Sequence, residues 1–371
     1  MSTRSRPPFR ADHVGSLLRP DKLKRARAAF QRGELSAGAL REIEDAEVRR
    51  IVKRQEEIGL QAVTDGEFRR DYWYLDFMWR VGGVERGDGS YLLRFRTDKQ
   101  KVEAPVPSFK VFGKLRLEET IFGDDFVFLK NNSRVRPKLT IPSPSMLHFR
   151  GREMKIDRAV YPDLEDYRRD LGAVYAAEIA ALGKLGCTYL QLDDTSWGFA
   201  ADPEWRARLE AGMESPRGLL ETYAEVVNAA LAGKPAGMTV CMHVCRGNFR
   251  SAWAAEGGYD EVADVLFNKV NVDAYFLEYD DARSGSFAPL RQVPKNKVVV
   301  LGLVTSKSAL LEDKNELKKR IKEAEKYLPL ENLAISPQCG FASTIDGNAL
   351  SEEEQFAKLR LIVETAKDVW G

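Results

Sequence analysis

The sequence predicts a single (β/α)8 barrel over residues 1–371, with a β-rich insertion after the second strand. Short apolar, strand-like runs alternate with amphipathic helical segments along most of the chain, which is typical of parallel α/β folds. Eight such runs end at polar or turn residues, and eight strand–helix units are the number that closes a barrel. These runs end near Ser16, Glu67, Ser143, Asp193, His243, Glu278, Leu303 and Cys339.

A doubly wound open sheet is the alternative fold. It usually has fewer strand–helix units and a glycine-rich turn that binds phosphate. Neither G-x-G-x-x-G nor G-x-x-x-x-G-K-[ST] occurs in this sequence, which favours the barrel.

The first two units are read from the N-terminal quarter of the chain. A short strand closes on Gly15-Ser16, and a basic connection over Leu17–Arg32 follows it. Ala37–Gly59 is predicted as a helix, because its apolar residues fall on one face and its acids pair with bases elsewhere. Leu60–Asp65 is the second strand.

Residues 72–135 interrupt the alternation and are too long for an ordinary loop. Aromatic and alternating patterns predict strands near Tyr91–Arg96, Phe109–Phe112 and Phe126–Leu129. We expect a hairpin or small sheet that lies over one face of the barrel. Its aromatic residues can cover a planar ligand, form a structural lid or make a dimer contact.

Regular alternation resumes after the insertion. The strand Lys138–Ser143 is followed by the strand Thr188–Leu192 and then by the strands that carry His243, Glu278, Leu303 and Cys339. The helices expected between and after them are Asp163–Leu185, Pro216–Ala232, Asp260–Phe267, Ala309–Tyr327 and Glu352–Trp370.

Composition limits the classes of partner and compartment. Lys and Arg total 57 against 56 Asp and Glu, so the charge balance gives no indication of a nucleic-acid or anionic-membrane partner. The four scattered cysteines fit a reducing compartment better than a disulfide framework. Met1–Arg10 lacks the apolar core of a secretory signal, and no apolar run approaches the ~18 residues of a membrane span. We therefore expect a soluble, cytoplasmic protein.

The main chemical signal is His243 and Cys245, which lie two residues apart where a strand opens into a loop. Alternate residues of an extended chain point to the same side, so an imidazole nitrogen and a thiolate can face one point. Both are good zinc ligands. The alternative is a core histidine beside a cysteine that behaves as a small apolar residue, and the spacing alone favours that alternative.

Cys339 and Glu278 also end strand-like runs. Loops that follow the strands of a barrel share one face, where active sites lie. A second thiolate and a carboxylate would complete a tetrahedral zinc site with one replaceable ligand. The position of all four residues at strand ends favours a metal site over the structural alternative.

With these motifs the sequence resembles the catalytic barrel of cobalamin-independent methionine synthase, and more closely its stand-alone single-barrel relatives. The resemblance runs from Arg10 to the final helix. His243-Val244-Cys245, Glu278 and Pro337-Gln338-Cys339-Gly340 match the zinc-binding pattern of that family in order. The resemblance implies a zinc-dependent enzyme that moves a methyl group to a small-molecule thiol, homocysteine, to give methionine.

The resemblance also implies residues that hold the amino-acid part of homocysteine. Gly15-Ser16, Gly66-Glu67 and Leu192-Asp193-Asp194 fit the corresponding motifs, which assigns substrate binding to Ser16, Glu67 and Asp193. Asp194 stands where the synthase has Glu. Asp194 and His148 are candidates for proton delivery to the leaving group, with a structural hydrogen bond as the alternative for His148.

The methyl donor is left open at this stage. The full-length synthase has a second barrel that helps to hold a folate, and this sequence resembles one barrel alone. A methylated folate, a methylcorrinoid carrier or a smaller methyl donor therefore all remain as expectations.

Three other functions share part of the pattern. Epoxyalkane:coenzyme M transferase looks similar in its zinc motif, and Arg69, Arg70 and Arg246 could bind its sulfonate, although Glu67 and Asp193 favour an ammonium group instead. A metal-free barrel like uroporphyrinogen decarboxylase would need an arginine-rich pocket. A non-catalytic scaffold with structural zinc is the last alternative.

Overall fold

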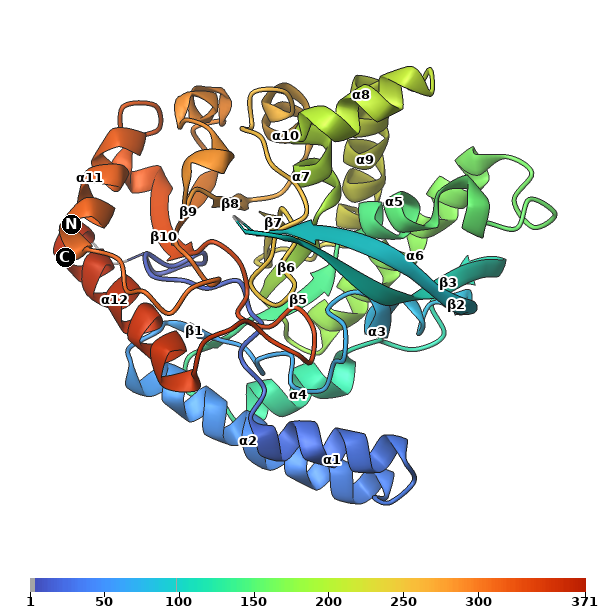
Figure 1. Ribbon diagram of the computed structural model, residues 1–371, viewed down its shortest axis with the longest axis horizontal. Coiled ribbons are helices and arrows are strands. Elements are labelled where there is room, and N and C mark those ends of the chain that lie inside the picture. The colour runs from blue at the N-terminus through green and yellow to red at the C-terminus, as the bar shows by residue number, and fades with distance from the viewer. Residues whose placement is uncertain (1–3, 98) are drawn as a thin grey trace.

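The computed structural model describes residues 4–97 and 99–371, without the side chains of residues 150–155. Residues 1–3 of the N-terminal segment considered above lie outside the described part. Six strands form one parallel sheet in the order β10-β9-β8-β7-β6-β5 (Figure 1). They are β5 (Leu139–Pro142), β6 (Tyr189–Asp194), β7 (Thr239–Val244), β8 (Ala274–Glu278), β9 (Val298–Val304) and β10 (Leu333–Pro337).

Two further segments close this sheet into a barrel. β1 (Ala62–Val63) pairs in parallel with β4 (Arg136–Pro137), which leads into β5, and residues 10–17 run between β1 and β10. The backbone hydrogen bonds across these seams run from Asp12 N to Ile335 O (3.1 Å), from Leu17 N to Gly66 O (3.0 Å) and from Lys138 N to Val63 O (2.9 Å). The predicted eight-stranded barrel is confirmed.

Helices surround the barrel and connect its strands (Figure 1). The principal ones are α2 (Ala37–Glu57), α6 (Leu164–Lys184), α9 (Pro216–Leu231), α10 (Ala263–Lys269), α11 (Lys314–Ala324) and α12 (Glu352–Trp370). Side-chain caps start several of them: Ser36 Oγ accepts the Ala39 amide of α2, and Ser351 with Glu354 forms a capping box on α12. Shorter helices α5 (Pro144–Lys155), α7 (Ser196–Ala201) and α8 (Pro203–Ala211) follow β5 and β6.

The segment between β1 and β4 contains a long antiparallel hairpin, β2 (Gly82–Arg96) and β3 (Lys101–Arg116). The hairpin lies across the front of the barrel in Figure 1. The strand expected at Phe126–Leu129 is wrong, because these residues belong to helix α4 (Gly123–Asn131). The basic connection expected at Leu17–Arg32 likewise contains helix α1 (Asp21–Gln31). A short helix, α3 (Leu75–Met78), precedes the hairpin.

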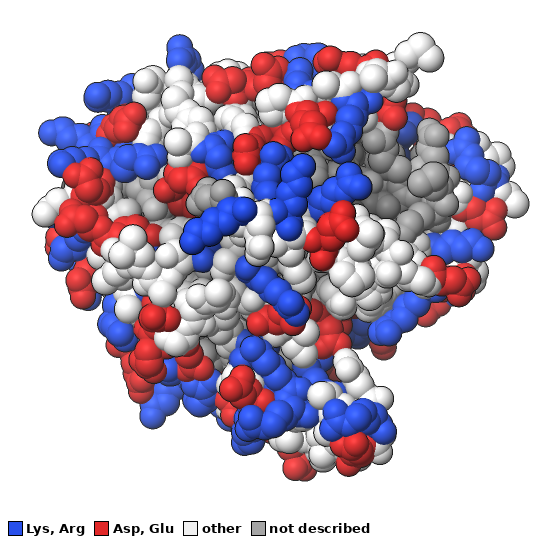
Figure 2. All heavy atoms as spheres, viewed as in Figure 1, with Lys and Arg blue, Asp and Glu red and all other residues white. Residues whose placement is uncertain are grey.

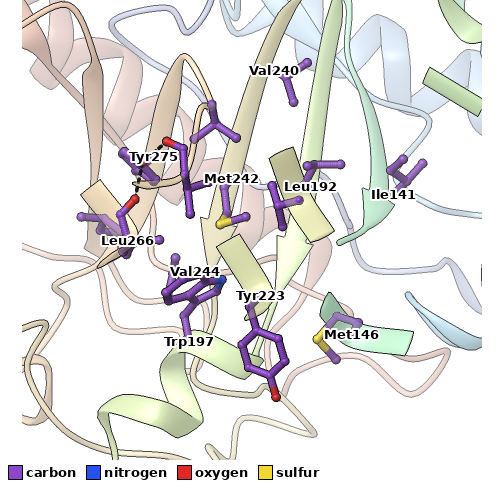
Figure 3. Packing of buried hydrophobic residues seen from close by; sticks show 14 of the residues in the cluster. Ile141, Met146, Leu192, Trp197, Tyr223, Val240, Met242, Val244, Leu266 and Tyr275 are labelled. Carbon is purple, nitrogen blue, oxygen red and sulfur yellow. Dashed lines mark hydrogen bonds between the residues drawn. The ribbon is translucent and has the colours of Figure 1, made fainter. Parts of the chain in front are cut away.

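Alternate side chains of β7 belong to two different apolar clusters, one outside the barrel and one inside it. Val240 and Met242 point outward and belong to the large apolar cluster that includes Trp197 and Tyr223 (Figure 3). Cys241 belongs to a separate buried cluster inside the barrel. Because successive side chains of a strand point to opposite faces, His243 lies on the inner side, as Cys241 does.

The face in Figure 2 carries basic and acidic side chains interspersed with one another. In the part of the chain that the structure describes, no helix combines the length and apolar character needed to cross a membrane.

Candidate metal centre and pocket

Four side chains from β7, from β8 and from the segments just after β7 and β10 converge at the carboxyl end of the barrel. One ligand atom from each of His243, Cys245, Glu278 and Cys339 lies within 4.8 Å of the other three, and all four residues are buried. His243 is in β7, Cys245 follows it, Glu278 ends β8, and Cys339 comes just after β10. β7, β8, β9 and β10 are neighbours in the sheet, so their ends bring residues 243 and 339 together.

The chemistry of these four groups fits a metal ion. Both ring nitrogens of His243 are buried and have no hydrogen-bond partner among the described residues. Buried polar atoms are nearly always satisfied, so an imidazole with two unused nitrogens indicates a missing ligand. The Cys245 and Cys339 sulfur atoms are 3.4 Å apart, and all four cysteines are free. Two thiolates on one tetrahedral zinc would lie about 3.8 Å apart, given Zn–S bonds of about 2.3 Å.

Neighbouring backbone and amide groups orient the candidate ligands. The Gly247 amide donates to Cys245 Sγ at 3.2 Å. The Arg246 amide donates to Glu278 Oε1 at 3.0 Å, and Gln338 Nε2 lies 3.5 Å from Glu278 Oε2. Such outer contacts fix the orientation of metal-binding side chains.

The electrostatics of the cluster favour one ionised sulfur. The hydrogen bond with Cys245 holds the pKa of Cys339 well below the ordinary thiol value and raises the pKa of Cys245. Burial lowers the pKa of His243, but Cys339, Asp193 and Glu278 together outweigh burial, so the net shift is upward. Burial raises the pKa of Glu278.

A pocket opens beside His243, Cys245 and Cys339, and Ser16, Glu67 and Asp193 line it too. Burial raises the pKa of Asp193 to about 7, against the opposing effect of His243. Thr140 Oγ1 donates to Glu67 Oε1 at 2.8 Å, while Glu67 Oε2 is buried with no partner among the described residues. The three residues assigned to substrate binding therefore face one space, with a carboxylate oxygen free to accept.

Asp194 and His148 are not among the residues that line this pocket. Asp194 follows Asp193 in β6 and points to the other side of the strand, where its carboxylate accepts hydrogen bonds from the Ser196 amide (2.6 Å) and from Ser145. His148 lies on α5 with its ring between Tyr167 and Tyr223, at centroid distances of 6.2 and 5.8 Å. In this arrangement neither side chain reaches the cluster.

The opposite wall of the pocket is aromatic and comes largely from the insertion. Phe95 of β2 packs against Phe249 with ring centroids 5.3 Å apart, and Trp73 and Tyr74 lie beside them. The Phe95–Phe249 pair could not be predicted from the sequence, because the two residues are far apart along the chain. The sequence pattern had indicated only that the insertion covers a face.

The fold and the cluster define a (β/α)8 protein with a candidate metal centre at the carboxyl ends of its strands. Residues 158–368 match the catalytic domain of the cobalamin-independent synthase. The chain is 47% identical to the uncharacterized protein YxjH of Bacillus subtilis over 98% of this chain and 95% of that protein. It is 25% identical to the methionine synthase of Pyrococcus furiosus, over 88% of this chain and 84% of that one.

Solved structures agree with these relatives. A structure from Listeria monocytogenes, described as a candidate vitamin-B12-independent methionine synthase, superposes with a TM-score of 0.81 at 40% identity. The match covers 99% of this chain and all of that one. This protein therefore belongs to the cobalamin-independent methionine synthase family, a family of methyltransferases, as the sequence motifs predicted.

Proposed function

We propose that the protein transfers a methyl group to the thiol of homocysteine, giving methionine, and that it requires zinc bound by His243, Cys245, Glu278 and Cys339. The observation that carries this proposal is the convergence of these four buried side chains within 4.8 Å beside a pocket. A divalent zinc ion in such a site favours the thiolate form of a bound thiol, which is the nucleophilic form.

The remaining pocket residues suit the amino-acid end of homocysteine. Glu67 Oε2 and the Asp193 carboxylate offer acceptors for the ammonium group, and the Ser16 hydroxyl offers a donor for the carboxylate. Both carboxylates are almost fully buried, so an ammonium partner would be favoured strongly over water. Three anchors at one end of a small substrate fix the position of its sulfur.

Relatives support the same product. A structure from Shewanella sp. W3-18-1 that shares the fold, with a TM-score of 0.70 at 19% identity, is a B12-independent methionine synthase in complex with selenomethionine. The methyl donor would approach from the aromatic wall of Phe95 and Phe249. A methylated folate and a methylcorrinoid carrier are the two donors to test.

The arginines that kept a sulfonate substrate under consideration are occupied elsewhere. Arg69 pairs with Asp45 at 2.5 Å, and Arg70 donates to the Thr140 carbonyl at 2.7 Å. The Arg246 guanidinium donates to the Gly257 carbonyl at 2.6 Å. An acidic pocket favours an ammonium-bearing thiol over coenzyme M, and family membership favours methyl transfer over a metal-free decarboxylase.

Metal analysis and homocysteine binding test this proposal together. The purified protein should contain about one zinc per chain, and His243→Ala or Cys339→Ser should lose it. Asp193→Asn is the matched control, because it should weaken homocysteine binding while it retains the metal. Undiminished methionine formation by a preparation that is free of bound metal would contradict the proposal.

A further inference from the structure

Gln191 lies in β6, two residues before the pocket acid Asp193, and it is fully buried. Leu192, which stands between them, belongs to the apolar cluster outside the barrel (Figure 3), so Gln191 and Asp193 both point into the barrel. Gln191 is not among the residues that line the pocket. It therefore lies one step deeper in the barrel than Asp193, out of contact with a bound substrate.

The side-chain amide of Gln191 makes two short hydrogen bonds. Its Nε2 donates to Asp193 Oδ1 at 2.6 Å and to the Val14 carbonyl at 2.6 Å. A backbone carbonyl can only accept, so the nitrogen end of this amide must face the two partners. The amide therefore holds the Asp193 carboxylate through one oxygen, which leaves Oδ2 for a ligand in the pocket.

The same amide joins two parts of the pocket that are far apart along the chain. Val14 lines the pocket and stands two residues before Ser16, which lines it too. Gln191 thus connects the acid that would hold the substrate ammonium to the segment whose hydroxyl would hold the substrate carboxylate. Two anchors at a fixed separation match one end of an amino acid.

A neutral donor suits a carboxylate that must bind a cation. Asp193 is buried, and burial disfavours the charged form of an acid, whereas a hydrogen bond to the carboxylate favours it. A cationic side chain in the place of Gln191 would also stabilise the carboxylate, but it would compete with the substrate ammonium for the same charge. The amide orients Asp193 and leaves its negative charge to the substrate.

We propose that Gln191 is a positioning residue for the substrate, whose amide holds the Asp193 carboxylate in the orientation that accepts the ammonium group of homocysteine. This inference rests on the proposed function, in which Asp193 binds that ammonium. Because Gln191 acts through Asp193, it affects the binding of thiols that carry an amino group and leaves the binding of other thiols unchanged.

Calorimetric titration of the zinc-loaded protein with two thiols tests this role. One thiol is homocysteine, and the other is γ-mercaptobutanoate, which is homocysteine without its amino group. Gln191→Met has a similar length but no donor, and it should raise the Kd of homocysteine about tenfold, in line with the loss of a hydrogen bond to a charged group. The Kd of γ-mercaptobutanoate should change by less than about twofold, and the zinc content should not change.

Two further variants separate positioning from a general loosening of the barrel. Gln355→Met removes another fully buried glutamine amide, whose Oε1 accepts the Leu18 amide at 2.8 Å. This matched control should keep the ratio of the two Kd values at the wild-type level. In an Asp193→Asn background, Gln191→Met should weaken homocysteine binding no further, because Gln191 acts through the carboxylate that is already lost.

The outcomes separate the two proposals. Zinc-loaded wild-type protein that binds neither thiol would overturn the proposed function itself. A wild-type preference for homocysteine that Gln191→Met retains in full would overturn the role of Gln191 alone. If Gln191→Met does not fold, Gln191→Asn, which keeps the amide on a side chain one carbon shorter, supplies the comparison with the same expected loss of preference.

Discussion

Asp193 and Asp194 are adjacent in sequence, but their side chains point to opposite faces of the barrel wall. The two acids are neighbours in β6, yet Asp193 lines the pocket and Asp194 accepts hydrogen bonds from Ser145 and Ser196 outside the barrel. The side-chain period of a strand is two residues, so a one-residue difference exchanges the inner and outer faces. Two adjacent acids in a sequence motif therefore do not share a role.

Gly340 packs against Ser16 with no room for a side chain. A Cβ atom at this position would lie 1.9 Å from Ser16 Oγ. Gly340→Ala should therefore displace Ser16 and lower the free energy of unfolding by about 1–3 kcal/mol, the usual range for overpacking. Thermal or denaturant unfolding measures the change.

Gly38→Ala is the control for this prediction, because no atom lies within 4 Å of a Cβ at that position near the start of α2. It should leave stability unchanged or raise it slightly. Equal stability of the Gly340→Ala and wild-type proteins, with homocysteine binding unchanged, would show that Ser16 adapts freely.

At the scale of elements, the β2–β3 hairpin converts the open end of the barrel into a pocket. Arg96 joins the hairpin to the chain after β7: its amide donates to the Trp253 carbonyl at 2.7 Å, and the Trp253 amide donates back to its carbonyl at 2.9 Å. Arg96 also pairs with Asp202 at 3.1 Å. The hairpin is thus fastened by backbone and ionic contacts as well as by the Phe95–Phe249 ring pair.

Phe95→Ala should loosen the hairpin without unfolding the barrel. Phe95 is 7% exposed, and removal of a buried phenylalanine ring costs on the order of 3 kcal/mol. Amide protons of β2 and β3 should exchange faster in the variant, while those of β6 and β7 stay protected. Hydrogen exchange followed by mass spectrometry measures both regions at once.

Leu92→Ala offers a matched control on the same strand, since Leu92 is 59% exposed. Its exchange should resemble wild type. Equal exchange in Phe95→Ala and Leu92→Ala would mean that the ring pair does not hold the hairpin.

Helix α4 explains why the insertion was harder to predict than the barrel. The apolar run Phe126–Leu129 resembles a strand, because Phe126 and Phe128 are two residues apart, the side-chain period of a strand. In the helix, Phe126 and Leu129 are buried while Phe128 is only partly buried, which is a spacing of three. Short apolar runs satisfy both periods, so tertiary packing decides between them.

For the whole molecule, a buried acid should link stability to pH. Glu178 of α6 is fully buried and accepts the Ile121 amide with both carboxylate oxygens at 3.1 Å. Burial raises its pKa from 4.5 to about 7. Between these two values the folded state binds more protons than the unfolded state, so this group destabilises the fold as the pH rises through that window.

Glu178→Gln should remove that dependence, because the amide oxygen still accepts from Ile121 and carries no charge. Relative to wild type, the variant should gain up to about 3 kcal/mol in unfolding free energy between pH 4 and pH 8. Denaturant unfolding at both pH values gives the difference. A constant gap between the two proteins across this range would show that Glu178 does not titrate in it.

The sequence by itself determined the barrel and the motifs of its carboxyl end. Strand-like runs that stop at polar residues are local patterns in the sequence. Eight such strands, each followed by a connection, predict a closed parallel barrel. The residue types of His243, Cys245, Glu278 and Cys339, and their positions at the ends of strand-like runs, can also be read from the sequence. The structure brings together these four residues, which the sequence motifs had already identified.

The tertiary structure alone decided which neighbours these residues meet. The 3.5 Å approach of Gln338 to Glu278 depends on the pairing of β8 with β9 and of β9 with β10, and no local sequence pattern reports either pairing. Likewise, the hairpin is held at the pocket by contacts with Asp202, Phe249 and Trp253, which lie far from it along the chain. Such contacts depend on how the whole chain packs. Electrostatic and apolar interactions act between groups that are close in space, and the sequence does not show which distant groups become close.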